Sequence, residues 1–172
     1  MIQLEPFTEA DIDRLIGWVT SKETHILWTA SFFEYPLTRE PFRKFMAESA
    51  ARGDRRFYKA IEAETGEPVG HIELGAIDPR NRSTRIGRVL VAPRAQGRGA
   101  ATAMMRAALE IAFGEMKMHR VDLLVFDINT RAIACYEKAG FRHEGLFRES
   151  FKGPEGYWGV VIMSILAGEW KP

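Results

Sequence analysis

The chain has 172 residues, a formal net charge of +1 and a single cysteine. This length fits one domain spanning residues 1–172 with a core of its own. The nearly balanced charge argues against a nucleic-acid-binding surface, which usually brings a strong basic excess. One cysteine cannot form an internal disulfide, and neither a signal peptide nor a membrane-spanning run is evident. We therefore expect a cytoplasmic protein that binds neither nucleic acid nor membrane.

Strand-like and helix-like segments alternate along the chain, and their order indicates the fold class. Runs rich in β-branched residues predict strands, and apolar residues three or four apart predict helices. In chain order we expect a strand at 2–6, a helix at 8–18, an irregular aromatic-rich connection at 21–36, a helix at 38–51, strands at 56–62, 69–77 and 85–92, a helix at 100–113, a strand at 120–127 and a helix at 130–138. This order predicts an α/β fold with a mixed sheet of six or seven strands, flanked by about four helices.

A basic, glycine-rich turn, Arg94–Gly99, joins a predicted strand to a predicted helix. Gly97 and Gly99 permit left-handed backbone conformations and close approach of a ligand. The first N–H groups of the helix lack internal partners and point at this turn, where the helix dipole adds partial positive charge. Such a place binds phosphate, and Arg94 and Arg98 would add full charges. The alternative is a tight structural turn with both arginines in solvent.

Two familiar phosphate-binding loops do not match this turn. A P-loop requires Gly-Lys followed by Ser or Thr, and the chain contains no such run. The dinucleotide fingerprint requires a third glycine where this chain has Thr102. An enzyme that binds NAD or ATP is therefore the weaker alternative.

Two motifs in this order resemble those of the GNAT superfamily of N-acetyltransferases. Arg94-x-x-Gly97-x-Gly99 after a Val-Leu-Val strand is similar to the acetyl-CoA signature of that family. Asn129 and Tyr136, seven residues apart, resemble its closing motif. The resemblance extends more weakly over nearly the whole chain, with residues 157–166 similar to the last strand of the fold. The closest branch is the bacterial one that includes ribosomal-protein N-terminal acetyltransferases.

The resemblance implies an enzyme that transfers the acetyl group of acetyl-CoA directly to a primary amine in a ternary complex. No cluster of His, Cys and acidic residues has the spacing of a metal site, so we expect no metal ion. The acceptor would be a small molecule or a peptide: a protein N-terminus, a lysine, a polyamine, an amino acid derivative or an aminoglycoside. In this family the strand that matches Val89–Val91 parts from the strand that matches Leu123–Val125, and a backbone N–H near Val91 would donate to the thioester oxygen. The residues expected to bind acetyl-CoA are Val89, Leu90, Val91, Arg94, Ala95, Gln96, Gly97, Arg98, Gly99, Ala100, Asn129 and Tyr136.

Tyr136 is the candidate general acid, because a phenol and a thiol have similar intrinsic acidity. The alternative for Tyr136 is an aromatic ring packed on the sheet. Asn129 would bind the pantetheine amide or cap the following helix. Cys135 would form a covalent acetyl-enzyme or, in the interpretation we favour, pack as a buried thiol.

The general base is the least determined part of the predicted mechanism. The strand at 85–92 contains no Asp or Glu, which departs from the pattern of many relatives. Glu73 on the preceding strand is the candidate, and His71 shares its face because strand side chains alternate. Proton removal through water is the remaining alternative.

Acceptor choice is expected to depend on the N-terminal third and the last hairpin. Aromatic rings there would pack an apolar acceptor or receive a cation, and these rings belong to Trp28, Phe32, Phe33, Tyr35, Tyr157 and Trp158. Glu23, Glu34 and Glu155 would attract a positively charged acceptor. Six arginines form either a local basic patch or a solvated face: Arg80, Arg82, Arg85, Arg88, Arg94 and Arg98.

A protein from another functional class would share the phosphate-binding turn. A non-catalytic acyl-CoA-binding or sensing module would keep it and lack turnover. The intact pair Asn129 and Tyr136 favours the enzyme. The resemblance leaves the oligomeric state open, with a homodimer common among relatives.

Overall fold

The computed structural model describes residues 1–171 and contains one mixed sheet of seven strands, as the sequence predicts. The sheet order is β1-β2-β3-β4-β5-β7-β6, and β4 and β5 form its parallel pair. The strands are β1 (Ile2–Pro6), β2 (Arg56–Glu62), β3 (Glu67–Asp78), β4 (Ser83–Val91), β5 (Arg120–Phe126), β6 (Arg142–Gly153) and β7 (Gly156–Leu166). None of the helices in residues 1–171 is long and apolar enough to cross a membrane.

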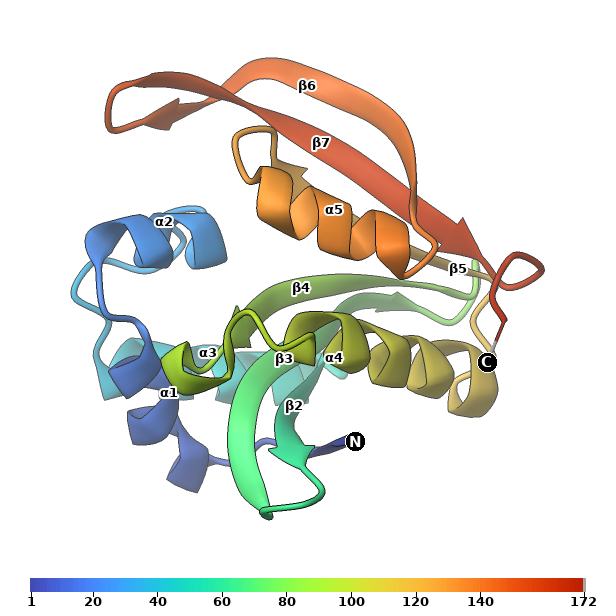
Figure 1. The fold of residues 1–172 in the computed structure, drawn as a ribbon, viewed down its shortest axis with the longest axis horizontal. Helices are drawn as coiled ribbons and strands as arrows, with labels where there is room; N and C mark the ends of the chain where they lie inside the picture. Colours follow the sequence, from blue (N-terminus) through green and yellow to red (C-terminus); the bar gives the residue numbers. More distant parts are fainter. Residues whose placement is uncertain (172) are drawn as a thin grey trace.

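Five α-helices accompany the sheet: α1 (Ile12–Trp18), α2 (Lys22–Thr29), α3 (Arg39–Arg52), α4 (Ala100–Leu109) and α5 (Thr130–Lys138). One apolar cluster joins α4 and α5 to the sheet, and a second joins α1, α2 and α3 to it. Figure 1 shows α5 with the β6–β7 hairpin on one side of the molecule and α4 with β1–β4 on the other. The expected α/β class is therefore confirmed.

The expectation of an irregular connection at 21–36 is wrong over its first half, where α2 forms. Ser21 caps this helix, its hydroxyl accepting a hydrogen bond from the Thr24 backbone N–H at 3.1 Å. His25, Ile26 and Trp28 are buried. A Ser cap followed by apolar residues on one face is enough to start a short helix when tertiary packing covers that face.

The helix predicted at 100–113 changes its winding part of the way along. It is α-helical as far as Leu109 and continues as a π-helical segment, Glu110–Glu115. The N–H of Met116 bonds to the carbonyl of Ile111 at 2.9 Å, one residue farther back than in an α-helix. Ala112 and Phe113 remain buried through this segment, so the apolar periodicity predicted the buried face correctly.

Strand β4 contains a bulge that changes which face its side chains occupy. The register shifts by one residue between His71–Leu90 and Glu73–Gly87, and Arg88 in the bulge has φ 44°. Ile86 packs in the cluster with α4, but Leu90 packs in the cluster with α1–α3. Because one extra residue reverses the alternation, Arg88 lies on the α3 side.

Candidate active site

The parallel strands β4 and β5 pair at one end only. Ser83, Thr84 and Arg85 pair with Arg120–Asp122, and no pairing of β4 with β5 continues beyond them in the described structure. From Ile86 onward, the β5-facing edge of β4 has backbone groups without a strand partner. Such groups must bind something else or water, so this opening is ready to receive a ligand.

Two cavities meet at this opening. The turn cavity, of about 550 Å³, is lined by the glycine-rich turn and the start of α4. The arginine cavity, of about 450 Å³, is lined by Arg55, Arg85 and Arg88. Both are lined by Leu27, Trp28, Val89, Asn129, Ala132 and Tyr136. Two ligands bound in the two cavities would therefore meet beside Val89 and Tyr136.

The glycine-rich turn has the backbone conformation that the sequence predicts. Gly97 and Gly99 have φ 78° and 80°, in the left-handed region that favours glycine. Gly99 is the N-terminal cap residue of α4, so the free N–H groups of the helix face the turn. The side-chain amide of Gln96 donates to the carbonyl of Val91 at 3.2 Å and fixes the turn to the end of β4.

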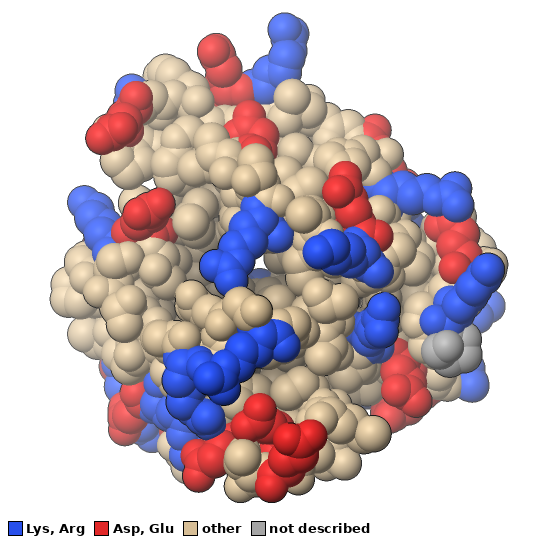
Figure 2. All heavy atoms as spheres, viewed as in Figure 1, with Lys and Arg blue, Asp and Glu red and all other residues tan. Residues whose placement is uncertain are grey.

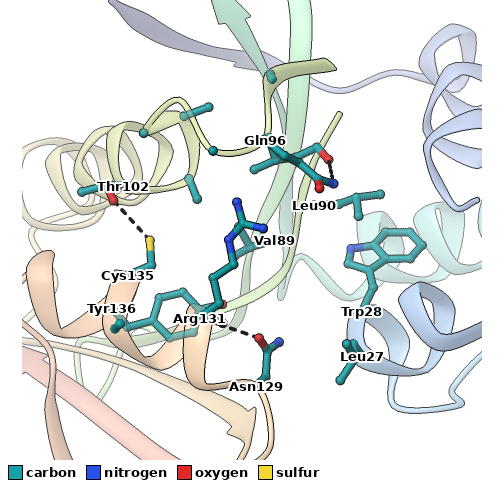
Figure 3. A pocket seen from close by; sticks show the side chains of 18 of the residues that line it. Leu27, Trp28, Val89, Leu90, Gln96, Thr102, Asn129, Arg131, Cys135 and Tyr136 are labelled. Carbon is teal, nitrogen blue, oxygen red and sulfur yellow. Dashed lines mark hydrogen bonds between the residues drawn. The ribbon is translucent and has the colours of Figure 1, made fainter. Parts of the chain in front are cut away.

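The arginines near the turn are arranged differently from the prediction. Arg94 donates to the carbonyl of Pro68 at 3.3 Å, and neither Arg94 nor Arg98 lines a cavity. Arg131 does line the turn cavity, and its Nη2 lies 3.8 Å from the position that a Cβ on Gly97 would take. Figure 3 shows Arg131 extending from α5 across the cavity, and Figure 2 shows Lys and Arg side chains gathered around a hollow on this face.

Arg131 is a residue that the sequence analysis missed. It lies in the first turn of α5, two residues after Asn129. Only Asn129 and Tyr136 of the closing motif were considered as site residues, so the charge between them was not given a role. Lys138 at the end of the same helix also lines the turn cavity. The positive charge beside the turn thus comes from α5 as well as from the α4 dipole.

Tyr136 lines both cavities and is partly buried, packed against the cluster that joins α4 and α5 to the sheet. Its hydroxyl has no hydrogen-bond partner in the described residues 1–171. Burial, with a smaller contribution from Cys135, raises the pKa of the Tyr136 phenol above its ordinary value. The hydroxyl therefore stays protonated at physiological pH and is available as a donor.

The two alternatives for Asn129 are both compatible with its position. Its side-chain oxygen caps α5 by accepting from the Ala132 N–H at 3.2 Å, so the capping role is present. Its amide nitrogen has no hydrogen-bond partner among residues 1–171, so it can donate toward the cavities that Asn129 lines. Cys135 lines the turn cavity, with its sulfur 3.3 Å from the Thr102 hydroxyl.

Glu73 is fully buried and lines neither cavity. Its Oε2 accepts from Arg55 Nη1 at 2.7 Å and from Arg88 Nη1 at 2.9 Å, and its Oε1 lies 3.2 Å from His71 Nε2. Burial raises the pKa of Glu73, but the His71 hydrogen bond and the charges of Arg88 and Arg55 outweigh it. The pKa of this carboxyl is therefore held below its ordinary value, and Glu73 is ionised at neutral pH.

The acids expected to attract a cationic acceptor are absent from both cavity walls. Glu23, Glu34 and Glu155 line neither cavity. Of the expected aromatic residues, Trp28 lines both cavities, whereas the rings of Phe32 and Phe33 face the guanidinium of Arg88. Arg88 itself is 14% exposed, which rules out a solvated face for this arginine.

The glycine-rich turn at the start of α4, the opened β4–β5 pair and a protonated tyrosine between two cavities fit the class of transferases that bring a phosphate-bearing carrier to an acceptor. Residues 21–141 match the model of the Acetyltransferase (GNAT) family. The chain therefore belongs to this family, and the expected enzyme class, an acetyltransferase, is confirmed.

Relatives of this chain include enzymes with different acceptors in their names. The spermidine N(1)-acetyltransferase of Vibrio cholerae is 30% identical over 131 residues, 76% of this chain and 72% of the relative. A putative ribosomal N-acetyltransferase, YdaF of Bacillus subtilis, is 27% identical over 98% of this chain and 91% of its own length. The crystal structure of the Vibrio cholerae spermidine N-acetyltransferase with CoA and spermine has a TM-score of 0.87 at 24% identity, over 98% of this chain and 96% of that one.

Proposed function

We propose that this protein, as a single domain spanning residues 1–172, transfers the acetyl group of acetyl-CoA to a primary amine by direct attack in a ternary complex. The observation that carries the proposal is the meeting of the two cavities beside Val89, Asn129 and Tyr136. Acetyl-CoA occupies the turn cavity, and the amine approaches from the arginine cavity. The Vibrio cholerae enzyme of similar fold has been crystallised with CoA and spermine, which supports a complex that holds both ligands together.

The turn and β4 hold the acetyl donor. The pyrophosphate lies against the backbone N–H groups at Gly97–Ala100, with Arg131 adding charge. The pantetheine arm lies along the open edge of β4. A backbone N–H near Val91 donates to the thioester oxygen, and one such donor contributes about 2.7–4 kcal/mol in the transition state.

The reaction forms one bond and breaks one. The lone pair of the neutral amine attacks the thioester carbon, and the carbonyl electrons move to the oxygen. When the tetrahedral intermediate collapses, the C–S bond breaks and the Tyr136 hydroxyl donates its proton to the sulfur. The nitrogen loses a proton to a base, and the products are the acetamide and the CoA thiol.

The general base stays a prediction, and its three candidates are Glu73, His71 and water. Glu73 is ionised, as a base must be, but it is enclosed by Arg55, Arg88 and His71. A proton could reach it from the arginine cavity only through these neighbours. Water in the cavity reaches the nitrogen directly, so loss of the proton to water is the simpler route.

Initial-rate kinetics test the ternary complex. Varying acetyl-CoA at several fixed amine concentrations should give intersecting double-reciprocal lines, and Cys135→Ala should leave the pattern and the rate unchanged. Parallel lines with the wild-type enzyme, together with loss of the parallel pattern in Cys135→Ala, would instead indicate a covalent acetyl-cysteine.

The match to the acetyltransferase family disfavours the non-catalytic acyl-CoA-binding module that the sequence allowed. Release of free CoA thiol with a panel of amines separates the two functions, because a module would bind acetyl-CoA without releasing thiol. A homodimer and a cytoplasmic location also stay predictions, the first of which sedimentation of the purified protein would test.

A further inference from the structure

We propose that the acceptor carries a carboxylate as well as its amine, and that Arg55 and Arg88 bind this carboxylate in the arginine cavity. The inference rests on the proposed function and names the substrate class: a small amino acid or a similar amine with an apolar body. It is carried by the arrangement of two guanidinium groups that share one buried carboxylate.

The wall of the arginine cavity is positively charged. Among the described residues that line it, three are arginines and none is Asp or Glu. Arg85 is neutralised by an ion pair with Asp122. Arg55 and Arg88 share Glu73, so this cluster keeps one net positive charge when His71 is neutral. A positive wall attracts an anion and repels a polycation such as spermidine.

Both guanidinium groups have donors left for a ligand. In each arginine Nη1 binds Glu73, whereas Nη2 has no hydrogen-bond partner among residues 1–171. The Nε atoms of both side chains are buried and also have no partner. Because the Nε atoms are enclosed, the Nη2 groups are the donors from which a ligand carboxylate placed here would accept.

The two guanidinium groups are held in place by their neighbours. The Arg88 guanidinium lies over the Phe45 ring at 4.5 Å and the Phe32 ring at 4.9 Å, and Arg55 lies over Phe45 at 5.1 Å. Arg55 also rests on Gly75, where any Cβ would collide with the guanidinium. Donors fixed in this way lose little freedom when a ligand binds.

The rest of the cavity indicates the chemistry of the acceptor between its amine and its carboxylate. Its remaining wall is largely apolar, contributed by Leu123, Val125, Phe126, Phe151 and Val160. The end shared with the turn cavity carries Val89 and Tyr136, where the amine must reach the thioester. The cavity thus receives an amine at one end and an anion at the arginines, with apolar atoms against the remaining wall.

A matched pair of acceptors tests the proposal. L-phenylalanine and L-phenylalaninamide differ only in the carboxylate, and CoA thiol release is measured with each, corrected for the fraction of neutral amine. We expect kcat/KM to be roughly 10- to 100-fold higher for the acid. Equal rates, or a higher rate with the amide or with spermidine, would overturn the proposal.

Variants assign this preference to the arginines. Arg55→Gln leaves Glu73 paired with Arg88 and should lower the acid-to-amide ratio about tenfold. Arg56→Gln removes the same charge from an exposed neighbour that lines neither cavity, and should keep the ratio. A ratio unchanged in Arg55→Gln would show that the cluster is only structural.

Binding measurements separate this inference from the proposed function. If neither phenylalanine probe is acetylated, N-acetyl-L-phenylalanine and its amide are titrated into the protein saturated with CoA. Tighter binding of the acid, lost in Arg55→Gln, supports the carboxylate site, and equal or absent binding of both refutes it. Failure of acetyl-CoA binding itself would refute the proposed function and leave the carboxylate measurement interpretable on the free protein.

Discussion

The turn cavity and the arginine cavity meet at Tyr136 but are built differently. The part of the turn cavity where we propose that phosphate binds comes from one short stretch of chain: Ala95, Gln96, Gly97, Gly99 and Ala100. The arginine cavity takes its charges from Arg55 before β2 and from Arg85 and Arg88 on β4, all through side chains. In the proposed function, carrier binding therefore depends on backbone conformation, whereas acceptor choice depends on side-chain charge.

The largest expected effect is on the backbone of the turn cavity. Gly97→Asp places a side chain in a left-handed conformation and a carboxylate near Arg131, where the phosphate should bind. We expect at least a 100-fold loss of acetyl-CoA affinity by calorimetry, since the carboxylate repels the pyrophosphate and occupies its arginine. Gly66→Asp, at φ 71° with nothing within 4 Å of its Cβ position, is the control for backbone strain and should bind normally. Normal binding by Gly97→Asp would remove the turn from the carrier site.

Tyr136→Phe tests the point where the two cavities meet. Loss of the hydroxyl should lower kcat by about 100-fold, because the sulfur then leaves without a proton donor. The affinity for acetyl-CoA should change less than twofold, as the ring and its packing remain. A kcat equal to that of the wild-type enzyme would leave Tyr136 as a packing residue.

Glu73→Gln tests the buried carboxylate behind the arginine cavity. Arg55 and Arg88 would lose their shared counter-ion, and the free energy of unfolding should fall by about 3 kcal/mol at pH 7 in urea denaturation. Because the folded pKa of Glu73 lies below the ordinary value of 4.5, its stabilisation is present above that pH and is lost as pH falls through the folded pKa. As the pH falls, the free energy of unfolding of Glu73→Gln should therefore decrease less than that of the wild-type protein. Glu40→Gln, an exposed partner of Arg43, is the control and should change stability little.

The same variant separates a base from a positioning residue. If Glu73 accepts the proton, kcat falls at every pH between 6 and 9. If it only holds the arginines, KM for the acceptor rises while kcat and the pH profile stay close to wild type.

A smaller effect is expected from single arginines beside the turn cavity. Arg131→Gln should weaken acetyl-CoA binding by about tenfold, because it removes a charge-assisted hydrogen bond to phosphate. Arg98→Gln should weaken it by less than threefold, since Arg98 lines neither cavity. Calorimetry at two salt concentrations checks this order. A larger loss of affinity in Arg98→Gln than in Arg131→Gln would instead support the sequence-based prediction that Arg98 contributes charge at the phosphate.

The smallest effect should follow from a change that removes no charge. Gly75→Ala displaces the Arg55 guanidinium and should lower the acid-to-amide ratio by a few fold. Gly145→Ala on β6 meets only an ordinary contact at 3.5 Å and should leave the ratio unchanged. An unchanged ratio in Gly75→Ala would mean that the position of Arg55 does not matter to the acceptor.

The sequence by itself determined the fold class, most of the strands and the backbone conformation of the glycine-rich turn. Each depends on short-range properties: alternation, helical periodicity, and glycines whose backbone freedom is visible at a single position. The order of Gly97, Gly99, Asn129 and Tyr136 was also enough to indicate the family. The exception near the N-terminus was α2, which is short and depends on the packing of Trp28 more than on its own propensity.

Only the tertiary structure decided which charges face each cavity. Arg94 and Arg98 belong to the turn in sequence but do not line its cavity, whereas Arg131 reaches the cavity from α5. The β4 bulge places Arg88 on the α3 side, beside Arg55 and Glu73, and neither alternation nor composition predicted that grouping. The physical reason is that backbone conformation is set by neighbouring residues, whereas the direction and partner of a long charged side chain are set by elements far away in the chain.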